Sequence, residues 1–249
     1  MTLTVHQFPC LSDNYGFLIR DEASGKVATI DTPDAEAILA ELAKLGWSLD
    51  LILNTHWHPD HAGGNEALKT ATGATITGPA EVTRIAPLDR VVRGGDVVML
   101  GETRFEVIDA GGHTLGHIAY HDAADAIAFV GDTLFALGCG RLFEGTPEQM
   151  WDSLSRVADL PDDTTVYCAH EYTASNARFA LSVDDDPALK ARADAVFAAR
   201  ERGEPTVPTT IAAEKATNPF LRAPLLRPLA TTPAQAFAEI RAAKDSFKG

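Results

Sequence analysis

The sequence has few of the features that mark secreted, membrane or disulfide-stabilised proteins. Among 249 residues there are three cysteines, Cys10, Cys139 and Cys168, which are too few and too far apart for a disulfide scaffold or a Cys-x-x-Cys metal site. No apolar run approaches the roughly 20 residues that span a bilayer. Residues 1–10 lack the basic and apolar regions of a signal peptide. We therefore expect a cytoplasmic protein with no membrane partner.

Basic residues are also scarce. There are 21 Lys and Arg against 35 Asp and Glu, for a net charge of −14, which argues against a nucleic-acid partner bound through its phosphates. The acidity is uneven, because residues 1–170 carry 25 acidic and 10 basic side chains and residues 171–249 carry 10 and 11. The C-terminal third can therefore present a local basic patch.

The remaining composition is that of an ordinary globular protein, at 45% hydrophobic and 22% charged. Up to residue 170, short apolar or alternating runs predict strands, with a helix over 34–45 and another over 147–158. From residue 171 the pattern predicts helices alone, separated by proline-rich loops. We expect an α/β domain over 1–170 and a small helical domain over 171–249. The strands are expected at 2–6, 16–20, 26–30, 49–53, 75–77, 96–100, 104–109, 117–121, 126–130 and 165–168, and the C-terminal helices at 171–181, 187–202 and 233–247.

The densest group of chemically active side chains follows the apolar run 49–53. Here His56 and His58 are two apart, so in an extended segment both side chains point the same way. Pro59 then turns the chain, and Asp60 and His61 can face a neighbouring position. Imidazole and carboxylate are ligands for a borderline divalent metal such as zinc, manganese or iron. The cluster predicts a metal site.

Three further ligand candidates each follow an apolar strand and stand beside glycine or alanine: His113, Asp132 and His170. Together with the first cluster they supply five histidines and two aspartates, enough for two metals that share one carboxylate. His117 is expected to support the site or the core, and His121 is expected at the surface. The cysteines are expected to be buried apolar residues.

This ligand pattern resembles that of the metallo-β-lactamase superfamily, whose fold is an αββα sandwich. Four further segments resemble the glyoxalase II (hydroxyacylglutathione hydrolase) family within it, so that the similarity extends over almost the whole chain. They are residues 138–146, 170–173, 218–222 and 241–248.

The resemblance implies how the ligands divide between two divalent metal ions. His56, His58 and His113 would hold the first ion, Asp60, His61 and His170 the second, and Asp132 would bridge them. Zinc is the first expectation, and iron and manganese stay open. The implied substrate-binding residues are Arg141, Phe143, Tyr172, Arg241 and Lys244.

Two of these residues depart from the family pattern. Arg141 stands where some members have lysine, which keeps the charge, and Phe143 stands where those members have tyrosine, which removes a hydroxyl.

The implied reaction is hydrolysis of S-D-lactoylglutathione to glutathione and D-lactate, the second step of methylglyoxal detoxification. Metal-bridging hydroxide would attack the thioester carbonyl, and Asp60 would orient the hydroxide. A thiolate leaves readily, so no strong general acid is needed. The small-molecule thioester is the expected partner, and a monomer is expected.

The alternative is a mononuclear iron glutathione persulfide dioxygenase. Such an enzyme would use two histidines and one aspartate, from His58, His113 and Asp132.

Overall fold

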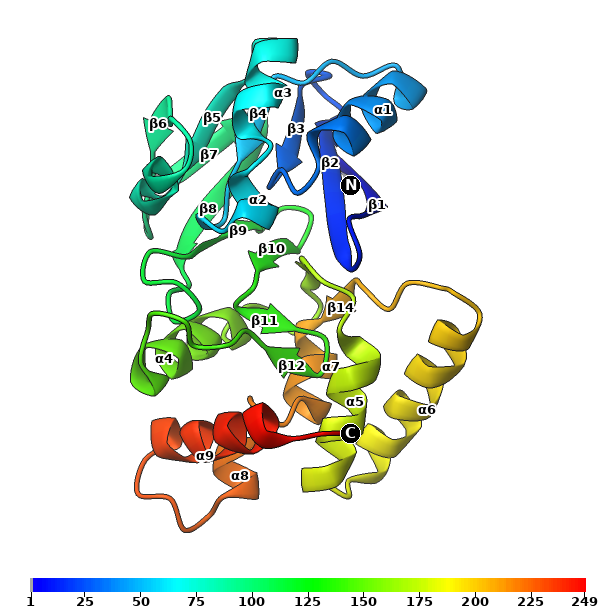
Figure 1. Ribbon diagram of the computed structural model, residues 1–249, viewed down its shortest axis with the longest axis vertical. Coiled ribbons are helices and arrows are strands. Elements are labelled where there is room, and N and C mark those ends of the chain that lie inside the picture. Colours follow the sequence, from blue (N-terminus) through cyan, green and yellow to red (C-terminus); the bar gives the residue numbers. More distant parts are fainter. Residues whose placement is uncertain (1) are drawn as a thin grey trace. The chain divides into compact units, whose positions relative to one another are not determined.

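The computed structural model describes residues 2–249, which form two compact units (Figure 1). Unit 1 contains residues 2–109 and 116–131, and unit 2 contains residues 110–115 and 132–249. Residues 132–170 thus pack with the C-terminal helices, whereas the sequence pattern grouped them with the strands. The division into domains at residue 170 stays a prediction.

The first sheet of unit 1 keeps its strands in chain order. The strands β1, β2 and β3 are antiparallel, and β3 to β6 run parallel. Parallel neighbours need a crossover, and helices α1 and α3 supply the first two. The bounds are β1 Leu3–Cys10, β2 Asn14–Asp21, β3 Val27–Ile30, α1 Ala35–Leu45, β4 Leu51–Leu53, α2 Pro59–Ala62, α3 Asn65–Thr72, β5 Thr75–Gly78, the 3₁₀ helix Ala80–Arg84 and β6 Arg90–Val91.

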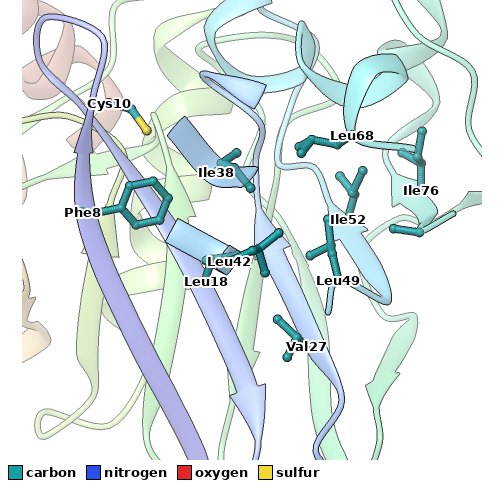
Figure 2. Close-up of a cluster of buried hydrophobic side chains, with 11 residues drawn as sticks. Phe8, Cys10, Leu18, Val27, Ile38, Leu42, Leu49, Ile52, Leu68 and Ile76 are labelled. Carbon is teal, nitrogen blue, oxygen red and sulfur yellow. The ribbon is translucent and has the colours of Figure 1, made fainter. Parts of the chain in front are cut away.

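Both crossover helices cover one face of this sheet. Figure 2 shows Ile38 and Leu42 of α1 in one buried cluster with Leu68 of α3 and with Ile52 and Ile76 of the strands. The α1 helix begins where the Asp34 carboxylate accepts two backbone N–H groups. It ends at Gly46, whose φ of 66° suits a residue without a side chain. Local caps and a shared apolar face thus agree in placing the helix.

The second sheet of unit 1 is an antiparallel meander of β7 Val97–Leu100, β8 Thr103–Asp109, β9 Ile118–Asp122 and β10 Ile127–Gly131. Its inner side chains meet those of the first sheet, since the rings of Phe17 and Phe129 are 5.8 Å apart. The Tyr120 hydroxyl donates to the Asn54 carbonyl at 2.8 Å. The prediction that His121 is at the surface is wrong, because it is 6% exposed. Alternation along a strand shows which face a residue takes, and both faces of β9 are covered.

Unit 2 is mainly helical. It contains the hairpin of β11 Leu134–Phe135 and β12 Gly138–Cys139, the pair β13 Thr165–Cys168 and β14 Thr209–Thr210, and six helices within residues 2–249. The helix expected over 147–158 is confirmed as α4, and the Thr146 hydroxyl caps its start by accepting from the Gln149 N–H. The helix over 211–217 was not predicted. The helices are α4 Pro147–Ala158, α5 Thr173–Val183, α6 Pro187–Glu201, α7 Ile211–Thr217, α8 Ala223–Leu226 and α9 Pro233–Ser246.

Within unit 2, α5 packs beside α6, and α9 packs beside α4 and α8 (Figure 1). Across residues 2–249, every helix is too short or too polar to cross a membrane.

Candidate active site

In unit 1 the candidate ligands lie just after the buried strand β4. His56 Nε2 and His58 Nδ1 are 3.0 Å apart, so the two side chains converge as their spacing predicted. Pro59 then begins α2, whose first turn carries Asp60 and His61. Asp60 Oδ2 lies 3.6 Å from His61 Nε2 and accepts from Asn14 Nδ2 at 3.2 Å. Two pairs of ligand atoms are thus formed within ten residues of the end of one strand.

A buried carboxylate that the sequence analysis missed orients two of the candidate ligands of this unit, His61 directly and His56 through Thr55. Asp31 Oδ2 accepts from His61 Nδ1 at 2.8 Å and from the Thr55 hydroxyl at 2.7 Å. The Thr55 oxygen lies 3.1 Å from His56 Nδ1 and can accept its hydrogen. Both rings then carry their hydrogen on Nδ1 and present Nε2 as a lone pair, the state that binds metal. The available signal was position, because Asp31 directly follows the apolar strand β3.

In unit 2 the remaining candidates gather around Asp132. His113 Nε2 lies 3.4 Å from Asp132 Oδ2, and His170 Nε2 lies 3.4 Å from Asp132 Oδ1. His113 Nδ1 donates to the Arg141 carbonyl at 2.9 Å, which fixes Nε2 as the ligand atom. One carboxylate therefore faces a different imidazole with each of its oxygens.

These separations fit metal coordination. Two ligand atoms about 2.1 Å from a tetrahedral zinc ion stand about 3.4 Å apart. The four pairs within the units measure 3.0, 3.6, 3.4 and 3.4 Å. Neutral imidazole and carboxylate form the donor set that zinc, iron and manganese accept. Side chains able to hold a metal ion thus occur in both units.

Unit 2 also contains a pocket of about 440 Å³ beside Asp132 and His113. All five predicted substrate-binding residues line it, although they come from three separate stretches of the chain. The lining residues are His113, Asp132, Phe135, Cys139, Arg141, Phe143, Tyr172, Ser175, Asn176, Arg241 and Lys244.

The cations of this pocket differ in how they are held. Lys244 Nζ donates to the Ser175 carbonyl at 3.1 Å, and burial together with the nearby Arg241 and Arg141 lowers the pKa of Lys244 to about 8. Arg241 is 5% exposed and donates to the Cys139 carbonyl at 3.1 Å and to the Asp245 carboxylate at 2.8 Å. Part of the Arg241 guanidinium is therefore engaged within the protein.

Aromatic rings flank the ligands of unit 2. The Tyr172 ring stacks on His170 with centroids 4.7 Å apart, and the Phe143 ring meets the edge of His113 at 5.2 Å. Phe143 is 63% exposed and lines the pocket, so its ring contributes apolar surface there.

Within residues 2–249, the buried cysteines near the candidate ligands do not have the lowered thiol pKa of a nucleophile. Burial raises the pKa of Cys139 to about 11 and the pKa of Cys168 to about 12. These values agree with the prediction that the cysteines are apolar core residues. His117 is buried and stacks on His56 with centroids 4.6 Å apart, as expected of a supporting residue.

The chain matches two protein families in adjacent ranges. Residues 24–170 match the Metallo-beta-lactamase superfamily, and residues 171–247 match the hydroxyacylglutathione hydrolase C-terminus. The hydroxyacylglutathione hydrolase of Maricaulis maris is 58% identical, over 98% of this chain and 99% of the relative. That of Erythrobacter litoralis is 55% identical, over 98% of this chain and 100% of the relative.

Two solved structures with lower sequence identity share this fold. The crystal structure of ETHE1 from Myxococcus xanthus is 30% identical with a TM-score of 0.71, over 96% of this chain and 90% of that chain. The structure of TTHA1623 in a di-iron-bound form is 26% identical with a TM-score of 0.64, over 88% of this chain and 100% of that chain. The predicted α/β fold is confirmed, and the fold with its histidine and aspartate clusters supports binding of divalent metal. The chain belongs to the hydroxyacylglutathione hydrolase family of the metallo-β-lactamase superfamily.

Proposed function

We propose that this protein hydrolyses S-D-lactoylglutathione to glutathione and D-lactate, the second step of methylglyoxal detoxification. The observation that carries the proposal is the pocket of unit 2, in which Arg141, Arg241 and Lys244 stand beside Asp132 and His113. Glutathione has two carboxylates, and the pocket offers cations for them next to candidate metal ligands. The family membership supports the same activity.

We assign the seven ligand residues to two divalent metal ions. His56, His58 and His113 would hold the first ion, Asp60, His61 and His170 would hold the second, and Asp132 would serve both. The two Asp132 oxygens, each 3.4 Å from a different histidine, support the bridging role. Zinc is the first candidate for both ions.

The bound metals would supply hydroxide at neutral pH by lowering the pKa of a coordinated water. In the hydrolysis a carbon–oxygen bond forms, the carbon–sulfur bond breaks, and the sulfur leaves as a thiolate that later takes a proton. A thiol has a pKa of roughly 8.5, so the thiolate leaves without a strong general acid. The Asp60 carboxylate, held by Asn14, orients the attacking oxygen by accepting its hydrogen.

The pocket side chains bind and orient the thioester. Lys244 and Arg141 pair with the glutathione carboxylates. The buried Arg241 adds its positive charge to the pocket and attracts the same carboxylates. The Tyr172 and Phe143 rings pack against the apolar parts of the substrate. Phe143 has no hydroxyl and cannot donate a hydrogen bond to the substrate. Binding therefore depends more on the cations of the pocket.

Two coarser assignments complete the proposal. We assign the chain to the cytoplasm as a monomer, and its three free, buried cysteines support a reducing compartment. We assign catalysis to residues 1–170 and recognition of glutathione largely to residues 171–249.

The alternative function, a mononuclear iron dioxygenase, needs one ion on His58, His113 and Asp132. It gives no role to the contact between His170 and Asp132.

The test is release of free thiol from S-D-lactoylglutathione, with a small thioester that lacks glutathione as the comparison substrate. We expect fast release from the glutathione thioester and slow release from the small one. Treatment with a chelator should abolish both. Equal rates on the two thioesters would remove the pocket from recognition, and oxygen uptake with a glutathione persulfide would favour the dioxygenase.

A further inference from the structure

The turn between β11 and β12 is bound by buried side chains from two helices. The Leu137 N–H donates to Glu214 Oε2 at 2.9 Å. Asn218 Nδ2 donates to the Gly138 carbonyl at 2.9 Å, and Asn176 Nδ2 donates to the Ala136 carbonyl at 3.1 Å. Hydrogen bonds to side chains of α5 and of the α7 segment thus fix the backbone of this four-residue turn.

Glu214 is central to this arrangement. Its side chain is fully buried, so its carboxylate must find all of its partners inside the protein. Oε1 accepts from the Thr209 hydroxyl at 2.6 Å and pairs with Arg192. Oε2 accepts from Leu137 and from Asn218 Nδ2, both at 2.9 Å. One oxygen therefore anchors the carboxylate, and the other holds the turn.

The turn itself needs such support. Leu137 has a φ of 58°, in the left-handed region that costs energy for a residue with a side chain. Its side chain is fully buried in a cluster with Ala177 of α5 and with Leu189 and Ala193 of α6. A Leu in this conformation persists only where its surroundings determine it, and the bond to Glu214 supplies part of that determination.

The residues on either side of the turn line the substrate pocket. The Phe135 ring meets the edges of His170 and Tyr172, with centroid distances of 5.9 and 5.4 Å. The Cys139 carbonyl accepts from Arg241 Nη1 at 3.1 Å and so fixes that guanidinium. A shift of the turn would move one wall of the pocket and one of its cations together.

We propose that Glu214 is a positioning residue for binding of the glutathione part of the substrate, acting through the β11–β12 turn. The inference rests on the proposed function for its consequence in catalysis, but the hold on the turn does not depend on it. Asn218, in the segment 218–222 that resembles the family, shares the role through its bonds to the turn and to Glu214.

The decisive variant is Glu214→Gln, with Thr209→Val as its matched control. The amide oxygen of glutamine would turn to Arg192, the stronger donor, and its NH2 group would face the Leu137 N–H and Asn218. Two hydrogen bonds to the turn side are lost, so the KM for the glutathione thioester should rise about tenfold. Thr209→Val removes a bond from the other oxygen of the same carboxylate and should leave KM within about twofold.

Two readouts separate positioning from general destabilisation. Binding of S-methylglutathione, followed by calorimetry at a temperature where all variants are folded, should weaken about tenfold in Glu214→Gln alone. Hydrogen exchange should accelerate in residues 134–139 of that variant and not of Thr209→Val.

Unchanged binding in Glu214→Gln, or an equal loss in both variants, would overturn the proposal. Unchanged exchange at 134–139 in Glu214→Gln would overturn it independently of any activity. Failure of the unmodified protein to hydrolyse the thioester would instead count against the proposed function.

Discussion

The depressed pKa of Lys244 gives a pH dependence of substrate binding that can be worked out in advance. Burial and the neighbouring Arg241 and Arg141 lower this pKa to about 8. The ammonium is then about nine-tenths protonated at pH 7 and about one-tenth protonated at pH 9. In the proposed function, only the protonated form would pair with a carboxylate of the substrate.

We therefore expect the KM for the glutathione thioester to be flat below pH 7 and to rise about tenfold between pH 7 and pH 9. At higher pH the KM should level off at the value for the enzyme with a neutral Lys244. The kcat should change much less, because Lys244 lies in the binding pocket and is not among the assigned metal ligands. The assay is initial-rate thiol release across this pH range at constant ionic strength.

The matched control is Lys244→Arg, whose guanidinium stays charged throughout this range. Its KM should stay flat to pH 9, and that comparison removes any contribution from titration of the substrate itself. A flat KM in the unmodified protein, or the same rise in Lys244→Arg, would refute the reasoning.

Further predictions concern the other parts of the site and the core. Asp31→Asn should weaken metal affinity about tenfold to a hundredfold, because the orientation of His61 is lost, and competition with a chelator would measure it; unchanged affinity would contradict the orienting role. Arg241→Ala should raise KM far more than it lowers kcat. It should also lower the melting temperature, since Arg241 is buried and bonded to the Cys139 carbonyl. An unchanged KM would show that Arg241 takes no part in substrate recognition. Ile52→Ala should cost about 2–5 kcal/mol of unfolding free energy by denaturant titration, with unchanged activity per folded molecule; a cost below about 1 kcal/mol would contradict tight packing between the sheet and α1.

Features that depend on residues close together in the chain could be predicted from the sequence. The pairing of His56 with His58 depends only on the alternation of an extended chain, and the helix over 147–158 depends on a cap and a proline within four residues. Both were predicted from the residues alone. The assignment of Arg241 and Lys244 to a pocket came instead from the resemblance to a family, because spacing alone would leave them on an ordinary helix end.

Features that depend on distant contacts were missed. Asp31 lies 30 residues before His61, and its position after the apolar strand β3 does not identify His61 as its partner. Glu214 was not singled out, yet it is fully buried and pairs with Arg192. His121 was placed on the surface because strand alternation cannot show that both faces are covered. Each miss concerns a polar side chain whose burial is decided by tertiary structure.

The central claim is that two divalent metals on the seven assigned ligands support thioester hydrolysis. The most direct measurement is titration of the chelator-treated protein with zinc, following bound metal and thiol release from S-D-lactoylglutathione in the same samples. We predict that activity is absent without metal and reaches its maximum at two bound ions per chain. Full activity at one ion per chain, or thiol release that is independent of metal, would contradict the account.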